Sequence, residues 1–229
     1  PNTAVPMDDA LRANLAALLP TILSAEVTAM VEAYMGCHFR VVQCQLYRTE
    51  TGGKPHVSFL WHRDMEPMAQ VHVMVYFTAS GPGDPGTEFL SLEDSRRMAM
   101  HGYAFPTFDE RVADLADALP AGEPAPAAIR PELAAGDATI FAAPRLLHRG
   151  IDGSGGARDV FLLNLLPSLV PWQHDTARFG HDHLFWTGDG SDTLQTDPFR
   201  LILEPFTRHT GRPVSDWAIL GDLLPDGFA

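Results

Sequence analysis

The feature that most constrains the fold is a series of short apolar stretches between residues 39 and 166, separated by residues that favour turns. Each stretch is rich in β-branched or aromatic side chains, and Gly, Pro, Asn or Asp stand between many of them, which is typical of strands joined by turns. The stretches are FRVVQCQLYR (39–48), HVSFLWH (56–62), QVHVMVYFTA (70–79), TEFLSL (87–92), AIRPEL (128–133), DATIF (137–141), RLLHRG (145–150) and RDVFLLNLL (158–166). About eight strands are therefore expected, and the fold class is predicted to be mainly β with flanking helices.

Helices are expected on both sides of this β region. Residues 8–35 carry apolar side chains at helical spacing, Pro20 is expected to break them into two helices, and Gly36 is expected to end the second. Two further segments are predicted to be helical, FDERVADLADAL (108–119) and DPFRLILEPFTRH (197–209).

The whole chain, 1–229, is interpreted as a single domain because no clear linker divides it. It begins with N-terminal helices over 1–36. The β core is expected over 37–170, interrupted by a helical or loop insert at about 93–126, where the strand pattern stops. Residues 171–229 form a C-terminal extension.

Composition narrows the classes of partner. The formal net charge of −13 disfavours binding to nucleic acid or to an anionic membrane, so a small-molecule substrate is expected. The longest apolar stretch near the N-terminus, 13–25, is too short to span a bilayer. Only two cysteines are present, which favours a reducing compartment and hence a cytoplasmic location. Oligomeric state is left open.

Three residues have the types and spacing of a metal site. His62 and Asp64 stand at the end of a predicted strand, where residues i and i+2 project to the same side. His148 stands at another predicted strand much further along the chain. Two histidines and one carboxylate on one face form the facial triad of non-haem iron(II) oxygenases, which leaves three coordination positions open.

Arg158 follows His148 by ten residues and opens the last predicted strand. A guanidinium beside a metal site is suited to grip a carboxylate through two parallel hydrogen bonds. The distal carboxylate of 2-oxoglutarate is such a partner. Its keto oxygen and near carboxylate would occupy two of the open metal positions, and O2 would take the third.

These residues resemble the phytanoyl-CoA dioxygenase-like branch of the iron(II)/2-oxoglutarate oxygenases. The resemblance covers roughly residues 39–166 and is carried by four short motifs: WHRD with His62 and Asp64, GTEFL (86–90), LLHRG with His148, and GARD with Arg158. It implies a double-stranded β-helix (a jelly-roll or cupin-like barrel), bound iron(II), 2-oxoglutarate as cosubstrate and O2 as oxidant. The branch often has a Gly-Ser-His turn where this chain has SLED (91–94), so the substrate class is not carried over.

Polar residues near these motifs are candidates for the cosubstrate pocket. Alternation places Val41 on the same face as three polar residues of 39–48, which are Gln43, Gln45 and Tyr47. The resemblance implies that Gln45 lies beside the cosubstrate, and Tyr47, Thr87 and Asn164 could donate hydrogen bonds there, although for each a solvent-facing position is the alternative.

Other residues near the predicted ligands have simpler interpretations. His72 is interpreted as a core or cavity histidine rather than a ligand. Arg63 and Arg149 flank the predicted ligands on strands and are expected to point away from the metal, to the surface.

The predicted function is a 2-oxoglutarate-dependent dioxygenase that hydroxylates or otherwise oxidises a small organic substrate. Asp64 argues against halogenation, because related halogenases have a small residue there. Asn164 stands where the related DNA-repair demethylases carry a second Arg. The alternatives are a cupin-like metal-binding barrel without 2-oxoglutarate, acting as another dioxygenase, an isomerase or a non-catalytic sensor, and an interaction domain with a decayed site.

Overall fold

The computed structural model describes residues 2–52, 57–64, 66–181 and 184–185. The predicted helix at 197–209 and most of the C-terminal extension lie outside these residues. Two antiparallel sheets form the centre of the molecule, as expected from the strand pattern. Their strands are β1 (Asn2–Ala4), β2 (His38–Glu50), β3 (Val71–Tyr76), β4 (Gly86–Phe89), β5 (Ala138–Phe141), β6 (His148–Ile151) and β7 (Ala157–Ser168).

The two sheets exchange strands along the chain. The larger sheet has the order β1-β2-β7-β3-β5, and the smaller one pairs β4 with β6. Two single bridges extend the smaller sheet, His62 to His148 on one side and Phe89 to Ile129 on the other. From β3 to β7 successive strands therefore alternate between the two sheets. As a result, residues distant in sequence meet between the sheets.

A β-bulge in β2 decides which side chains reach the space between the sheets. β2 pairs along its length with β7, but the register shifts between Val41 and Gln43. The prediction that Val41 shares a face with Gln45 and Tyr47 is wrong. Val41 packs with Cys44 in the core beneath the helices, whereas Gln45 and Tyr47 line a cavity between the sheets. The extra residue of a bulge reverses the alternation of a strand, which sequence periodicity does not reveal.

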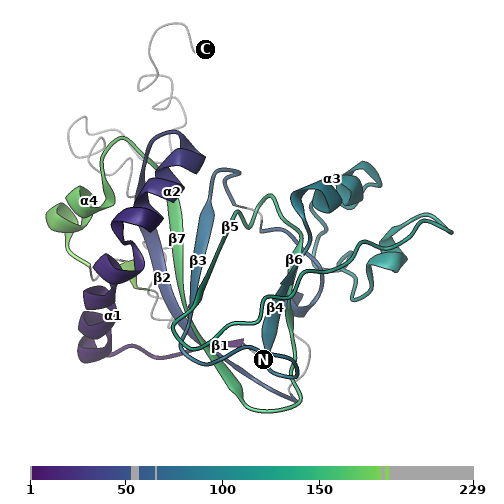
Figure 1. Ribbon diagram of the computed structural model, residues 1–229, viewed down its shortest axis with the longest axis horizontal. Helices are drawn as coiled ribbons and strands as arrows, with labels where there is room; N and C mark the ends of the chain where they lie inside the picture. Colours follow the sequence, from purple (N-terminus) through teal and green to yellow (C-terminus); the bar gives the residue numbers. More distant parts are fainter. Residues whose placement is uncertain (1, 53–56, 65, 182–183, 186–229) are drawn as a thin grey trace, which may run out of the picture.

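Helices α1 (Asp9–Ile22), α2 (Ala25–Met35) and α4 (Trp172–Phe179) lie on one side of the larger sheet, opposite β4 and β6 (Figure 1). The main apolar core lies between these helices and the sheet, and includes Leu15, Leu19, Val31, Phe39, Val73, Phe161, Leu163 and Trp172. Within the described residues, no single helix is both long and apolar enough to cross a bilayer. Only α1 and α2 taken together, with a 74° bend between them, reach that length and composition.

The expectation that Pro20 breaks the first helix is wrong, because α1 continues through Pro20 to Ile22. The break follows at Leu23 and Ser24, where the Ser24 hydroxyl accepts a hydrogen bond from the backbone N–H of Val27 and caps α2. The prediction that Gly36 ends the second helix is confirmed, since it adopts a left-handed conformation with φ of 73°.

The insert folds differently from the expectation. The predicted helix at 108–119 is reduced to one short 3₁₀ turn, Leu115–Ala118. Instead, the insert begins with α3 (Leu92–Met100). Ser91 caps this helix, because its hydroxyl accepts a hydrogen bond from the backbone N–H of Asp94. Leu115 packs into a satellite apolar cluster with Met98 of α3, so tertiary packing overrides helix propensity here.

Two predicted strands are also largely absent. Residues 57–59 of the expected strand 56–62 form a 3₁₀ turn, and this segment joins the smaller sheet only at His62. The expected strand 128–133 makes only single bridges at Ile129 and Leu133. Pro131 lies between these bridges and has no backbone N–H to continue a ladder.

Candidate metal centre

The structure brings His62, Asp64 and His148 together, as the sequence predicted. One ligand atom from each lies within 4.8 Å of the others, a spacing that could hold a metal ion. Asp64 Oδ1 lies 3.6 Å from His62 Nε2 and 3.8 Å from His148 Nε2. Both histidines are buried, and the Asp64 carboxylate is partly exposed. Two imidazole nitrogens and one carboxylate oxygen are a donor set that suits iron(II).

Backbone contacts fix which nitrogen of each imidazole faces the carboxylate. His62 Nδ1 lies 2.6 Å from the carbonyl oxygen of Leu60, and His148 Nδ1 lies 3.0 Å from that of Leu146. A carbonyl oxygen can only accept a hydrogen bond, so each Nδ1 carries the proton and donates it. Each Nε2 is therefore left with a free lone pair directed toward Asp64, which is the arrangement a metal ligand requires.

The protonation states also suit a metal. Burial, together with the neighbouring His148, lowers the pKa of His62 to about 4. Burial likewise lowers the pKa of His148. Burial alone would raise the pKa of Asp64, but the imidazoles of His148, His72 and His62 hold it below its usual range. Near neutral pH the group therefore presents two neutral imidazoles and an ionised carboxylate.

His72 lies beside this group, in line with its interpretation as a cavity histidine. Its Nδ1 is 3.7 Å from Asp64 Oδ2, and its Nε2 is 3.3 Å from Glu66 Oε2. The amide of Gln70 contacts both His72 and Glu66. This network borders the carboxylate oxygen that does not face His62 and His148, so it restrains the orientation of Asp64.

A cavity of about 350 Å³ between the two sheets contains the three candidate ligands. Its wall also includes Arg158 and the expected residues Gln45, Tyr47 and Thr87. Burial raises the pKa of Tyr47 to about 12, so the phenol keeps its proton and can donate a hydrogen bond into the cavity. Gln45, Tyr47 and Thr87 thus lie in the same cavity as the candidate ligands, and their contact with a cosubstrate stays a prediction.

Asn164, the fourth polar candidate, is not among the residues that line this cavity. Its side-chain amide donates instead to Gln43 Oε1 at 2.8 Å, across the pairing of β2 with β7.

Arg158 is a buried cation, with an exposed fraction of 2%. Its Nη1 donates to Thr87 Oγ1 at 2.8 Å, and its Nη2 donates to Thr49 Oγ1 at 3.2 Å. The guanidinium also lies over the rings of Tyr47 and Tyr76, at 5.8 and 5.9 Å. Its Nε is buried without a hydrogen-bond partner, and no carboxylate of the described residues lies within 4.0 Å of the guanidinium.

Sequence reasoning missed Thr49. It lies two residues beyond Tyr47 and four beyond Gln45 on β2, so extending the alternation of that strand would have placed it on the cavity face.

The expectation that Arg63 is a surface residue is wrong. Arg63 is buried, and it donates to the carbonyl oxygens of Ala104, at 2.7 Å, and of Ser95. Since Asp64 follows it directly, these bonds attach the ligand segment to the insert. Arg149 is partly buried rather than fully exposed, and its guanidinium binds Glu88 Oε2 at 2.9 Å.

No family model and no curated protein matches this sequence. Among solved structures, the chain is similar to the non-heme alpha ketoglutarate dependent carbocyclase SnoK from nogalamycin biosynthesis, with a TM-score of 0.49, 15% identity, and coverage of 72% of this chain and 69% of that chain. It is also similar to the epimerase SnoN from nogalamycin biosynthesis, with a TM-score of 0.42, 14% identity, and coverage of 72% and 60%. A third is HygX from Streptomyces hygroscopicus with nickel and 2-oxoglutarate bound, with a TM-score of 0.44, 16% identity, and coverage of 74% and 71%. At these identities and TM-scores, the activity of this chain has to be argued from its own residues.

Proposed function

We propose that this protein is a non-haem iron(II) oxygenase that uses 2-oxoglutarate and O2 to oxidise a small organic substrate in the cytoplasm. His62, Asp64 and His148 hold the iron, and Arg158 holds the distal carboxylate of 2-oxoglutarate. Gln45, Tyr47 and Thr87 line the cosubstrate part of the cavity. The motifs around these residues favour the phytanoyl-CoA dioxygenase-like branch of this superfamily.

The order of the strands supports a double-stranded β-helix. If the single bridges at His62 and Ile129 stand for two short strands, the smaller sheet has four members, paired in the order His62, β6, β4, Ile129. The larger sheet has β2, β7, β3 and β5 side by side. Such interleaving of two four-stranded sheets is the arrangement of a jelly roll, and places the proposed iron ligands between the sheets.

The buried guanidinium of Arg158 is the main reason to infer 2-oxoglutarate as the cosubstrate. An unpaired charge inside a protein costs several kcal/mol, so a buried cation is normally matched by an anion. Among the described residues, the guanidinium finds only hydroxyl and aromatic partners. It lies in the same cavity as the three candidate ligands. A ligand with a carboxylate at one end and a chelating group at the other could pair with Arg158 and bind the metal at the same time. 2-Oxoglutarate has these two ends.

The chain's own contribution is to position these groups and to exclude water. When bound, iron and 2-oxoglutarate together supply the oxidising chemistry with O2. Leu60 and Leu146 orient the imidazoles through their carbonyl oxygens, and Thr87 orients Arg158. Apolar side chains of Met74, Phe141 and Leu162 form part of the cavity wall and reduce its polar surface.

Anaerobic titration with iron(II), followed by 2-oxoglutarate, tests the proposal. A visible charge-transfer band should appear only after both are added, and it should be absent in Asp64→Ala. Arg158→Gln should retain iron but need far more 2-oxoglutarate to form the band. The exposed His101 provides the control, since His101→Ala should behave as wild type.

Two other results would change the assignment. Iron binding without any response to 2-oxoglutarate would indicate the cupin-like alternative. Failure of the wild-type protein to bind iron would rule out both metal-dependent functions.

A further inference from the structure

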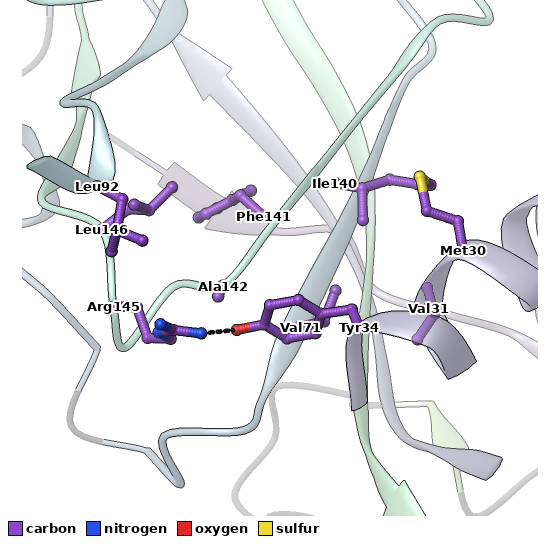
Figure 2. Close-up of a pocket in the computed structure, with 10 residues that line it drawn as sticks. All are labelled: Met30, Val31, Tyr34, Val71, Leu92, Ile140, Phe141, Ala142, Arg145 and Leu146. Carbon is purple, nitrogen blue, oxygen red and sulfur yellow. Dashed lines mark hydrogen bonds between the residues drawn. The ribbon is translucent and has the colours of Figure 1, made fainter. Parts of the chain in front are cut away.

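A second cavity lies outside the metal centre, where helix α2 passes the beginning of β3 and the end of β5 (Figure 2). Its volume is about 350 Å³, within the range of sites that bind small organic molecules. Most of its wall is apolar and includes Met30, Val31, Val71, Leu92, Ile140 and Leu146. These side chains come from segments far apart in the sequence.

One cation borders this apolar space. Figure 2 shows the Arg145 guanidinium meeting the Tyr34 hydroxyl at the edge of the cavity, where Arg145 Nη1 donates to Tyr34 Oη at 2.8 Å. No carboxylate of the described residues lies within 4.0 Å of Arg145, although the chain as a whole has a net charge of −13. The guanidinium keeps further donors for an anion, and the Tyr34 hydroxyl can donate its own proton to the same anion.

Phe141 connects this cavity to the metal centre. Phe141 is a lining residue of both cavities. The centroid of the Phe141 ring lies 5.3 Å from that of His148 and 5.4 Å from that of His72. A molecule in the second cavity would therefore be separated from the proposed iron ligand His148 by a single aromatic side chain.

We propose that the second cavity binds a small organic acid, and that this acid acts on the metal centre through Phe141. Its apolar body fills the space beside Ile140 and Leu146 and contacts Phe141, and its anionic group contacts Arg145 and Tyr34. The volume and lining limit the body to an aromatic, alicyclic or short alkyl group. The effect on the metal centre rests on the proposed function, whereas binding of the acid does not.

A pair of fluorescent probes tests the class of ligand. 1-Anilinonaphthalene-8-sulfonate is an aromatic anion, and N-phenyl-1-naphthylamine has the same aromatic body without the sulfonate. Full-length wild-type protein should bind the anion at one site. Arg145→Gln should weaken anion binding about tenfold or more, because it removes a charged hydrogen bond, and should leave the neutral probe unaffected.

Three further variants make the test specific to this cavity. Ala142→Leu fills part of the space and should weaken binding of both probes. Arg145→Lys retains the charge and should restore most of the preference for the anion. Arg96→Gln removes one positive charge from an exposed position of α3 and should behave as wild type. Circular dichroism confirms that each variant is folded.

Two results of these titrations would overturn the inference. Anion affinity unaffected by Arg145→Gln, or probe affinities unaffected by Ala142→Leu, would place the probes elsewhere. A wild-type dimer that Ala142→Leu dissociates in sedimentation experiments would show that a second copy of the chain covers the cavity.

Visible spectra of the cobalt(II)-loaded protein distinguish failure of this inference from failure of the proposed function. With cobalt(II) bound at the metal centre, the anionic probe should change the visible spectrum of the metal in wild type but not in Arg145→Gln. Failure to bind cobalt(II), with probe binding intact, would contradict the proposed function and leave the ligand class standing. Bound cobalt(II) whose spectrum does not respond to the probe would overturn the proposed effect of the acid on the metal centre.

Discussion

His62 and His148 are joined by two backbone hydrogen bonds, from His62 N to His148 O at 3.0 Å and from His148 N to His62 O at 2.9 Å. Their imidazole centroids are 4.5 Å apart. The main chain therefore positions both rings, and neither side chain is needed to hold the two segments together. The Nε2 atoms remain available to a metal, so the proposed metal-binding role of these residues can be tested separately from their contribution to the fold.

The first prediction follows from this separation. His148→Ala should lower the affinity for cobalt(II) by about 100-fold or more, because one of three protein ligands is lost. The metal-free variant should still fold, since both backbone bonds remain, with a lower melting temperature because a buried ring that packs near Phe141 is lost. Cobalt(II) titration and thermal unfolding measure the two effects. Equal cobalt(II) affinity in wild type and variant would contradict the assignment of His148 as a ligand.

Replacing Arg158 should weaken 2-oxoglutarate binding without lowering the free energy of unfolding. Arg158→Gln should weaken 2-oxoglutarate binding about 100-fold, since charged hydrogen bonds contribute about 1.5–3 kcal/mol each. The same variant should be as stable as wild type or more stable without ligand, because it removes a buried charge that lacks an anionic partner. Isothermal titration and urea unfolding test the two halves.

Arg63 is the matched control for Arg158, because it is also buried but its guanidinium donates to two backbone carbonyl oxygens. Arg63→Gln should lower the free energy of unfolding by about 1–3 kcal/mol. Should Arg158→Gln prove as destabilising as Arg63→Gln, Arg158 would be a structural residue rather than a cosubstrate anchor.

The stability of the metal-free protein should fall as the pH is lowered from about 6.5 to about 4. The pKa of His62 is lowered to about 4 in the folded protein, mainly by burial, whereas an exposed histidine titrates near 6.5. Between these values the unfolded chain binds a proton that the folded chain does not. A shift of this size corresponds to a loss on the order of 3 kcal/mol across this window, to which the neighbouring His148 contributes.

Urea unfolding at a series of pH values checks this expectation. His62→Gln should have a flatter pH profile than wild type over the same range. Identical profiles would indicate that His62 is as accessible to protons in the folded state as in the unfolded chain.

Leu147 is a core residue directly before the candidate ligand His148. Its exposed fraction is 0%, and it packs with Trp61 in the satellite cluster. Leu147→Ala should lower the free energy of unfolding by about 2–5 kcal/mol, because it leaves a cavity in packed surroundings. Leu169, with an exposed fraction of 96%, is the control, and Leu169→Ala should have almost no effect on urea unfolding. Comparable losses in both variants would contradict the packing described for Leu147.

Local sequence patterns predicted much of the candidate site. The i, i+2 spacing placed His62 and Asp64 on one side of their segment, although that segment joins the sheet only at His62. Strands with long uninterrupted patterns, such as β3 and β7, occur where expected. Periodicity and turn residues act between near neighbours, so they can be read from a single sequence.

Errors arose where contacts between distant segments decide the structure. Residues 108–119 have a helical pattern, but the packing of Leu115 with Met98 of α3 decides their conformation. Arg63 is buried because it donates hydrogen bonds to the carbonyl oxygens of Ala104 and Ser95. The register shift at Val41 depends on the pairing of β2 with β7.

The sequence by itself determined the residue types of the metal centre, the strand periodicity and the Arg158 cation, because these are properties of single residues and their neighbours. Only the tertiary structure decided that Thr87 and Thr49 hold Arg158, and that Phe141 separates two cavities. Those relationships join segments separated by tens of residues. They exist because the chain alternates between two sheets, an arrangement that no local pattern encodes.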